Sequence, residues 1–161
     1  MFSRIWAWIL SLLMMIFPWL GNYEPPLDWE AAALVVLDAI KTRDVDAIEA
    51  YMCKNIKDNV PNLHDEIGKF IDAIQGEITS LTKSSANGSG TYSNRGGKTI
   101  EQKLSAWDIE TTEGSYALSI KWEIYNNFSV EERGIRALGL MVETENGWES
   151  CHVMIIAPEG M

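Results

Sequence analysis

The stretch SYALSIKWEIYN, residues 115–126, alternates side chains of two kinds. One set is apolar throughout and consists of Tyr116, Leu118, Ile120, Trp122 and Ile124. The residues between them are mostly small or polar: Ala117, Ser119, Lys121, Glu123 and Tyr125. A period of two residues predicts a β-strand with one face covered by the core and the other in water.

The sequence on both sides of this strand predicts further strands. Downstream, the alternation continues through Arg136, Leu138, Leu140 and Val142, and Asn146-Gly147 is a hairpin signal that leads into residues 148–157. Upstream, Glu113-Gly114 joins a strand at residues 104–110 to the one at 115, and a shorter strand occupies residues 77–82. Short links between successive strands predict an antiparallel sheet.

Three amphipathic helices precede the strands. Asp28 is a good N-cap for the first, whose apolar residues recur at helical spacing from Trp29 to Ile40. Asp44 begins a second, shorter helix, and Asn62 caps a third that ends at Gly76. The apolar positions of the third helix are Leu63, Ile67, Phe70, Ile71 and Ile74.

The segment from Lys83 to Lys98 is rich in glycine and serine, which predicts a mobile lid or a disordered loop. It ends in Gly96-Gly97-Lys98-Thr99, which looks like the end of a phosphate-binding loop. The glycine required five places before Gly97 is Tyr92, and Thr99 enters a strand rather than a helix. Nucleotide binding is therefore not expected.

Helices followed by a one-sided antiparallel sheet predict an α+β fold in which the helices cover the apolar face of the sheet. In this order of elements the chain resembles a family of uncharacterised exported lipoproteins of Gram-positive bacteria, the domain of unknown function 5104, which is similar to the nuclear transport factor 2-like superfamily. The resemblance covers roughly residues 28–156 and rests on AIKTRDVDAIEAYM, LHDEIGKFIDAIQGEI, WDIETTEGSYALSIKWEIYN and GLMVETENGWE. It implies a cystatin-like cone, in which a curved sheet wraps around the helices.

The amino terminus predicts export. Residues 5–20 carry no charge and follow Arg4, which is the layout of a signal sequence. The 16 residues fall between the roughly 17–25 of a membrane span and the roughly 7–15 of a cleavable apolar region, so a retained anchor, a cleaved signal and an interfacial helix all stay open. We expect residues 1–22 to be a signal anchor or signal peptide, 23–27 a linker and 28–161 the folded domain.

One departure from the family bears on tethering. Its members usually carry a lipid-accepting cysteine just after the apolar run, whereas here Asn22 and Tyr23 follow Leu20-Gly21 and the first cysteine is Cys53. Lipidation is not supported. Tethering would then use residues 5–20, with the domain on the extracytoplasmic side of the cell membrane, or secreted if the segment is cleaved.

The net charge argues against nucleic-acid binding. The net charge is −10, and removing residues 1–22 takes away only Arg4, so the remainder carries −11. An acidic surface without a basic stripe is not expected to bind nucleic acid.

The two cysteines, Cys53 and Cys151, are far apart and belong to no Cys-x-x-Cys pair. An exported chain allows a disulfide between them, but free core thiols are favoured.

The sequence offers few residues for chemistry. His64 stands beside acidic residues with no second metal ligand type at i+4, so neither a metal site nor a cofactor is expected. His152 and Arg136 are polar candidates on neighbouring strands, and Tyr116 and Trp122 would supply aromatic walls. No carboxylate is expected to be buried among them.

These residues support two hypotheses. The first is an exported, membrane-tethered module that binds a small molecule, peptide or protein through its cone or its exposed sheet, with Tyr116, Trp122, Arg136 and His152 as candidate ligand-binding residues. The alternative, implied by the superfamily, is a small cone-pocket enzyme of the isomerase or dehydratase type, which needs an acid or base with a shifted pKa. Trp107 and Tyr125 are expected to face outward as exposed aromatics.

Overall fold

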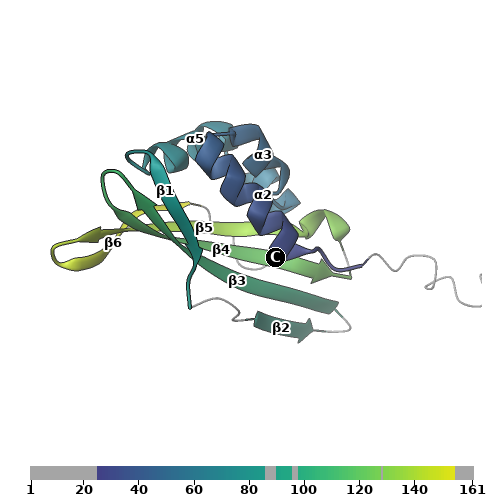
Figure 1. The fold of residues 1–161 in the computed structure, drawn as a ribbon. Coiled ribbons are helices and arrows are strands. Elements are labelled where there is room, and N and C mark those ends of the chain that lie inside the picture. The colour runs from purple at the N-terminus through teal and green to yellow at the C-terminus, as the bar shows by residue number, and fades with distance from the viewer. Residues whose placement is uncertain (1–24, 86–89, 96–97, 128, 155–161) are drawn as a thin grey trace, which may run out of the picture.

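The protein folds into a helical layer over one face of an antiparallel sheet. The computed structural model describes residues 25–85, 90–95, 98–127 and 129–154. The helices lie together over one face of the sheet, and no helix among these residues covers the opposite face (Figure 1). This arrangement is the predicted α+β fold.

Four α-helices come first in the chain. They are α2 (Trp29–Thr42), α3 (Val45–Ala50), α4 (Lys54–Asn59) and α5 (Leu63–Asp72). Asp28 and Asp44 cap α2 and α3 as predicted, because their carboxylates accept hydrogen bonds from the backbone N–H groups of Ala31 (3.1 Å) and Ala47 (3.0 Å).

Six strands form one sheet. They are β1 (Ile78–Lys83), β2 (Gly90–Arg95), β3 (Lys98–Thr111), β4 (Ser115–Asn126), β5 (Gly134–Thr144) and β6 (Gly147–Met154), with a 3₁₀ turn η2 (Val130–Glu132) before β5. All pairings are antiparallel in the order β1-β3-β4-β5-β6, and β2 pairs with β3 beside β1. The predicted antiparallel sheet is confirmed, with β4 at its centre.

The alternation along β4 determines which side of the sheet is covered. The five predicted inward residues are all buried against the helices: Tyr116, Leu118, Ile120, Trp122 and Ile124. The helices contribute the facing apolar side chains, among them Ile40, Ile67 and Phe70. The predicted covered face of this strand is thus confirmed.

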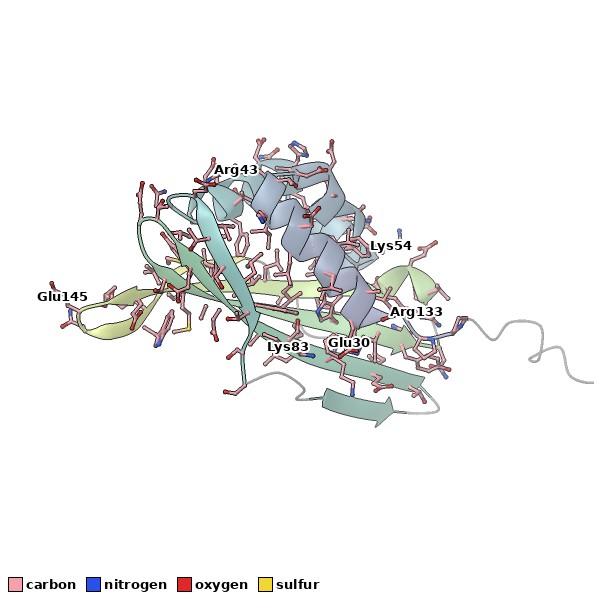
Figure 2. The ribbon with its side chains drawn as sticks, in the orientation of Figure 1. Glu30, Arg43, Lys54, Lys83, Arg133 and Glu145 are labelled. Atoms are coloured by element: carbon pink, nitrogen blue, oxygen red, sulfur yellow. The ribbon has the colours of Figure 1, made fainter. Side chains whose placement is uncertain are left out.

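Two sets of contacts tie the helical layer to the sheet. Lys83, at the end of β1, reaches Glu30 at the start of α2 (3.3 Å), as Figure 2 shows. Its ammonium also lies over the Trp29 ring. At the start of β5, the chain around Met52 runs beside Ile135, whose N–H donates to Tyr51 O (2.7 Å). Gly134 allows this close approach, since its φ is +140° and an added Cβ would overlap Tyr51 O.

Three details of the prediction are wrong. Helix α4 was missed because its six residues include only one buried apolar side chain, Ile56, which gives no period to read. Asn62 precedes α5 in a left-handed conformation, and its side chain caps nothing. The third helix ends at Asp72, although Gly76 does have a positive φ of 80°.

The predicted loop from Lys83 to Lys98 also differs from the structure. Residues 90–95 form β2, which pairs with the first residues of β3, so that β3 begins at Lys98 instead of residue 104. An edge strand is held by backbone hydrogen bonds and does not need apolar side chains. The composition of this segment therefore gave no sign of its pairing with β3.

The predicted anchor lies outside the described residues. Residues 1–24, which include the apolar run 5–20, are not described. Among the residues that are, no helix has the length and apolar character of a membrane span. The end of the predicted linker docks on the domain, because Leu27 N donates to Ile124 O (2.8 Å) and the Arg133 guanidinium donates to Pro25 O (2.8 Å).

Candidate functional site

The two aromatic candidates on β4 are part of the core. Trp122 has no exposed surface, and its indole N–H donates to the buried Ser105 Oγ (3.0 Å). Tyr116 is almost as well buried, and its hydroxyl accepts from Gln75 N (3.0 Å). Both polar atoms thus bond to the protein itself. These rings fill the space between sheet and helices, where a cone pocket would have to open.

The four predicted site residues are not gathered in one place. Tyr116 and Trp122 are six residues apart on β4, which corresponds to about 20 Å along a strand. Arg136 is near the Trp122 end, beyond the last paired residue of β5 and β6, Leu138. His152 lies opposite Leu140 in the β5–β6 register, and its side chain is outside the described part of the structure.

The alternation of residues along β6 is interrupted just before His152. Ser150 pairs with Met141 and His152 pairs with Leu140, so Cys151 is an extra residue in β6. A bulge of this kind puts the residues on its two sides out of phase. A simple two-residue alternation from Trp148 and Ser150 therefore does not continue to position 152.

Glu123 is a buried carboxylate that the sequence did not predict. Glu123 has no exposed surface, although the alternation of β4 places it among the solvent-facing residues. One carboxylate oxygen accepts from the Arg136 guanidinium (2.7 Å) and, more weakly, from Gln102 (3.5 Å), while the other accepts from the Asn126 amide (2.7 Å). We call Glu123, Arg136, Asn126, Gln102 and Glu132 the Glu123 network.

The network joins the sheet to α4. Glu132 lies 4.0 Å from the Arg136 guanidinium and accepts from the backbone N–H of Asn55 (3.2 Å) in the first turn of α4. Arg136 itself is the extra residue of a bulge, since Lys121 pairs with Ala137 and Trp122 with Ile135. The bulge lets Arg136 contact carboxylates from both β4 and η2.

The chemistry available to this network is limited by its bonds. A buried carboxylate in a protein is stabilised by a paired cation and by hydrogen bonds, and Glu123 has both. A general base must instead reach a substrate proton at hydrogen-bond distance. With both oxygens of Glu123 engaged, the geometry favours a structural role in holding η2, β4 and β5 together.

The two cysteines are free thiols in different surroundings. Cys53 is fully buried before α4, and burial raises the pKa of its thiol, opposed in part by a hydrogen bond with the Ile56 backbone and by the charge of Arg136. Cys151 is exposed on β6. The hypothesis of a disulfide between them is wrong, and the predicted core location holds for Cys53 alone.

The uncovered face of the sheet carries a shallow apolar hollow of about 340 Å³. Small residues on the central strands form its floor, because Ser119 and Gly139 lie opposite each other on β4 and β5. A Cβ on Gly139 would come within 2.6 Å of Ser119 Oγ, so the serine hydroxyl would have to turn away to make room for it. Leu104, Lys121 and Met141 surround the floor.

Two exposed apolar side chains stand at this end of the sheet. Met141 on β5 is 39% exposed, and Trp148 on β6 is 46% exposed. The predicted exposed aromatics were different ones: Trp107 pairs with the buried Leu118 on the covered side, and Tyr125 packs against the core under the Arg133 guanidinium. We call the hollow together with Met141 the outer sheet surface.

A second hollow, of about 350 Å³, opens between the end of α2, α5 and β1. Its lining is apolar at Ile71 and Ile74. The Arg43 guanidinium bonds to Asp72 (3.0 Å) and to Ile74 O (3.3 Å) there. The Arg43 guanidinium is thus already used to join α2 to α5. This hollow is best explained by helix packing.

Comparison with known families gives a fold-sized match. Residues 35–143 match a family described as "Domain of unknown function (DUF5104)". The match runs from within α2 to nearly the end of β5 and so includes both layers of the fold. None of the curated proteins matches the chain in sequence.

Proposed function

The chain belongs to the DUF5104 family, whose description names no activity, and we propose a function from the molecule itself: an exported, membrane-tethered module that binds a protein partner through its outer sheet surface. The observation that carries the proposal is the contrast between the two faces of the sheet. The covered face is filled by buried side chains, while the other face offers an open apolar hollow.

The tether is proposed from the sequence. Residues 5–20 are apolar and follow Arg4, which favours a retained amino-terminal anchor with the domain outside the cytoplasm. No lipid-accepting cysteine follows them, so the apolar run itself would hold the protein in the bilayer. Because Pro25 and Leu27 bond to the domain, its membrane-proximal end would be the one formed by η2 and the end of β4.

The fold implied by the family resemblance is part of the proposal. A nuclear transport factor 2-like cone places helices inside a curved antiparallel sheet, and helices on one face of such a sheet support that assignment. Relatives that use the cone for ligands need an open interior. Trp122, Ile120 and Phe70 are fully buried in this chain, which favours recognition elsewhere on the domain.

The outer sheet surface suits a protein partner better than a small molecule. Its hollow is shallow, whereas small-molecule sites are usually deep and enclosed. Met141 is exposed beside the hollow, and apolar side chains of this kind can anchor a protein interface. An apolar side chain of the partner would enter the space above Gly139. The acidic domain would attract a partner whose surrounding surface is basic, which raises the rate of encounter.

Site-specific photo-crosslinking tests the proposal. The full-length protein is expressed in its native cells with a photoreactive amino acid in place of Met141 or, in the matched control, of Leu34. Leu34 is a similarly apolar residue, 61% exposed on the helical side. We expect a discrete crosslinked species at position 141, recovered in the membrane fraction, and none at position 34.

Each other outcome removes part of the proposal. The absence of an adduct at position 141, or the same adducts at both positions, contradicts binding through the outer sheet surface. An adduct recovered only from the medium or the unsedimented fraction contradicts the membrane tether. An adduct of twice the mass of the chain identifies a second copy as the partner.

The Glu123 network is the observation that favours the enzyme alternative. An isomerase or dehydratase needs a buried carboxylate or histidine, and Glu123 is such a carboxylate. Its bonds to Arg136 and Asn126 would have to open for it to accept a proton from a substrate. A bound substrate in contact with Glu123 would therefore favour catalysis over the binding module.

A further inference from the structure

We propose that Asp46, Glu49 and His64 form a surface site for a divalent transition-metal ion of the zinc type. Asp46 and Glu49 are three residues apart on α3, and His64 is the second residue of α5. One ligand atom of each lies within 4.8 Å of the other two. Sequence spacing does not reveal this group, because the histidine comes from another helix.

The packing of two helices holds the ligands in place. Ile48 of α3 is fully buried between Asp46 and Glu49 in the chain, and Leu63, which precedes His64, is buried as well. Residues three apart on a helix lie on one side of it, so the two carboxylates project together. The core contacts of α3 and α5 thus fix the side on which His64 meets them.

The distances between the ligand atoms are close to those of metal coordination. His64 Nδ1 lies 3.1 Å from Glu49 Oε2 and 3.5 Å from Asp46 Oδ1. Zinc bonds of about 2.0–2.2 Å to nitrogen and oxygen place neighbouring ligand atoms of a tetrahedron about 3.3–3.6 Å apart. The 3.5 Å separation lies within this range and the 3.1 Å separation just below it, so small movements of exposed side chains would bring all three atoms to one ion.

A histidine–carboxylate ion pair explains the group less completely. Nδ1 carries at most one N–H, which can donate one good hydrogen bond, yet two carboxylates approach it. The carboxylates also repel each other at this spacing. A divalent cation between the three groups would neutralise both carboxylates and use the lone pair of the imidazole.

The surroundings leave room for further ligands. A hollow lined by Asp46, Glu49, Ala50 and Lys57 adjoins the group. The Lys57 ammonium donates to Ala50 O (3.1 Å), so it is held by the backbone on one side of this hollow. Three protein ligands with an open position are typical of zinc sites completed by water.

The type of ion follows from the donor set. Imidazole suits zinc, copper and nickel, whereas calcium and magnesium prefer oxygen ligands alone. The side chains are partly exposed, with Asp46 90% and Glu49 35% accessible, so we expect exchangeable binding and not a buried structural ion.

Isothermal titration of the full-length, tag-free protein in detergent with ZnCl₂ tests the site. We expect saturable binding of about one ion per chain, no comparable binding of MgCl₂, and the visible absorption of a low-symmetry complex when CoCl₂ replaces ZnCl₂. Loss of a partner that merely orients a ligand weakens metal binding about 10–100-fold, so His64→Asn is expected to weaken it at least tenfold. Asp46→Asn and Glu49→Gln are expected to weaken it in the same direction.

Two matched variants separate the site from general acidity. Asp65→Asn removes one exposed negative charge beside His64 without removing a ligand, and His152→Asn removes the other histidine. Both are expected to change the affinity by less than about twofold, since exposed charges interact weakly. Wild-type affinity in His64→Asn, or equal losses in Asp65→Asn and Asp46→Asn, would overturn the proposal, as would the absence of saturable zinc binding by the wild type.

Discussion

Replacing Arg136 with methionine is expected to lower the free energy of unfolding by about 3–5 kcal/mol. The reason is that the carboxyl group of Glu123, which has no exposed surface, would lose the cation that lies 2.7 Å away. Methionine has a similar length and fills most of the same space, so the loss reports the missing charge more than a cavity. Denaturant unfolding of the full chain in mild detergent, followed by fluorescence, measures it.

A matched variant and a double variant test whether the loss of stability in Arg136→Met comes from the buried charge. Arg43→Met breaks the Arg43–Asp72 pair, whose side chains are largely exposed, and is expected to cost less than about 1 kcal/mol. Adding Glu123→Gln to Arg136→Met removes the stranded charge and is expected to recover part of the loss. If Arg136→Met costs no more than Arg43→Met, the Glu123 network is not a buried structural element.

Truncating Trp122 to alanine is expected to cost about 3–5 kcal/mol. Its ring fills the space between β4 and the helices, and its indole N–H bonds to Ser105 Oγ at 3.0 Å. The truncation removes apolar burial and leaves a cavity in a region where the surrounding elements are fixed. Unfolding followed by circular dichroism measures the loss without relying on the tryptophan signal.

The matched control is Trp148→Ala, which removes the same ring from an exposed position on β6. We expect it to change stability by less than about 1 kcal/mol, since surface substitutions are usually small in effect. A small effect at Trp122 as well would mean that its ring lines an open pocket, as the cone-pocket hypothesis requires. The pair of variants therefore distinguishes a filled interior from a ligand cavity.

Much of the fold could be predicted because the strand alternation and the helix caps depend on neighbouring residues alone. The covered face of β4 and the caps at Asp28 and Asp44 are decided by a few neighbouring residues, and each of these predictions holds. Helix α4 and strand β2 lack such signals. Short apolar-poor segments adopt their structure through backbone bonds to distant parts of the chain, which periodicity cannot detect.

The candidate sites depended on contacts that spacing does not encode. Arg136 was recognised as a polar candidate, but its partner Glu123 was assigned to the solvent because alternation ignores bulges. His64 was compared only with residues on its own helix, whereas Asp46 and Glu49 come from α3. A search for opposite charges on neighbouring strands would have found the first pair, and no sequence signal identifies the second group.

In the described part of the chain, helices and packed side chains cover one face of the sheet and leave the other face open. Methyl NMR of the full chain in detergent, with a soluble paramagnetic agent in the water, tests it directly. We expect strong broadening of the Met141 methyl and little broadening of Leu118, Ile120 and Ile135, which are at most 1% exposed. Broadening of these three methyls to the extent seen for Met141 would contradict a filled interior and return the binding site to the cone.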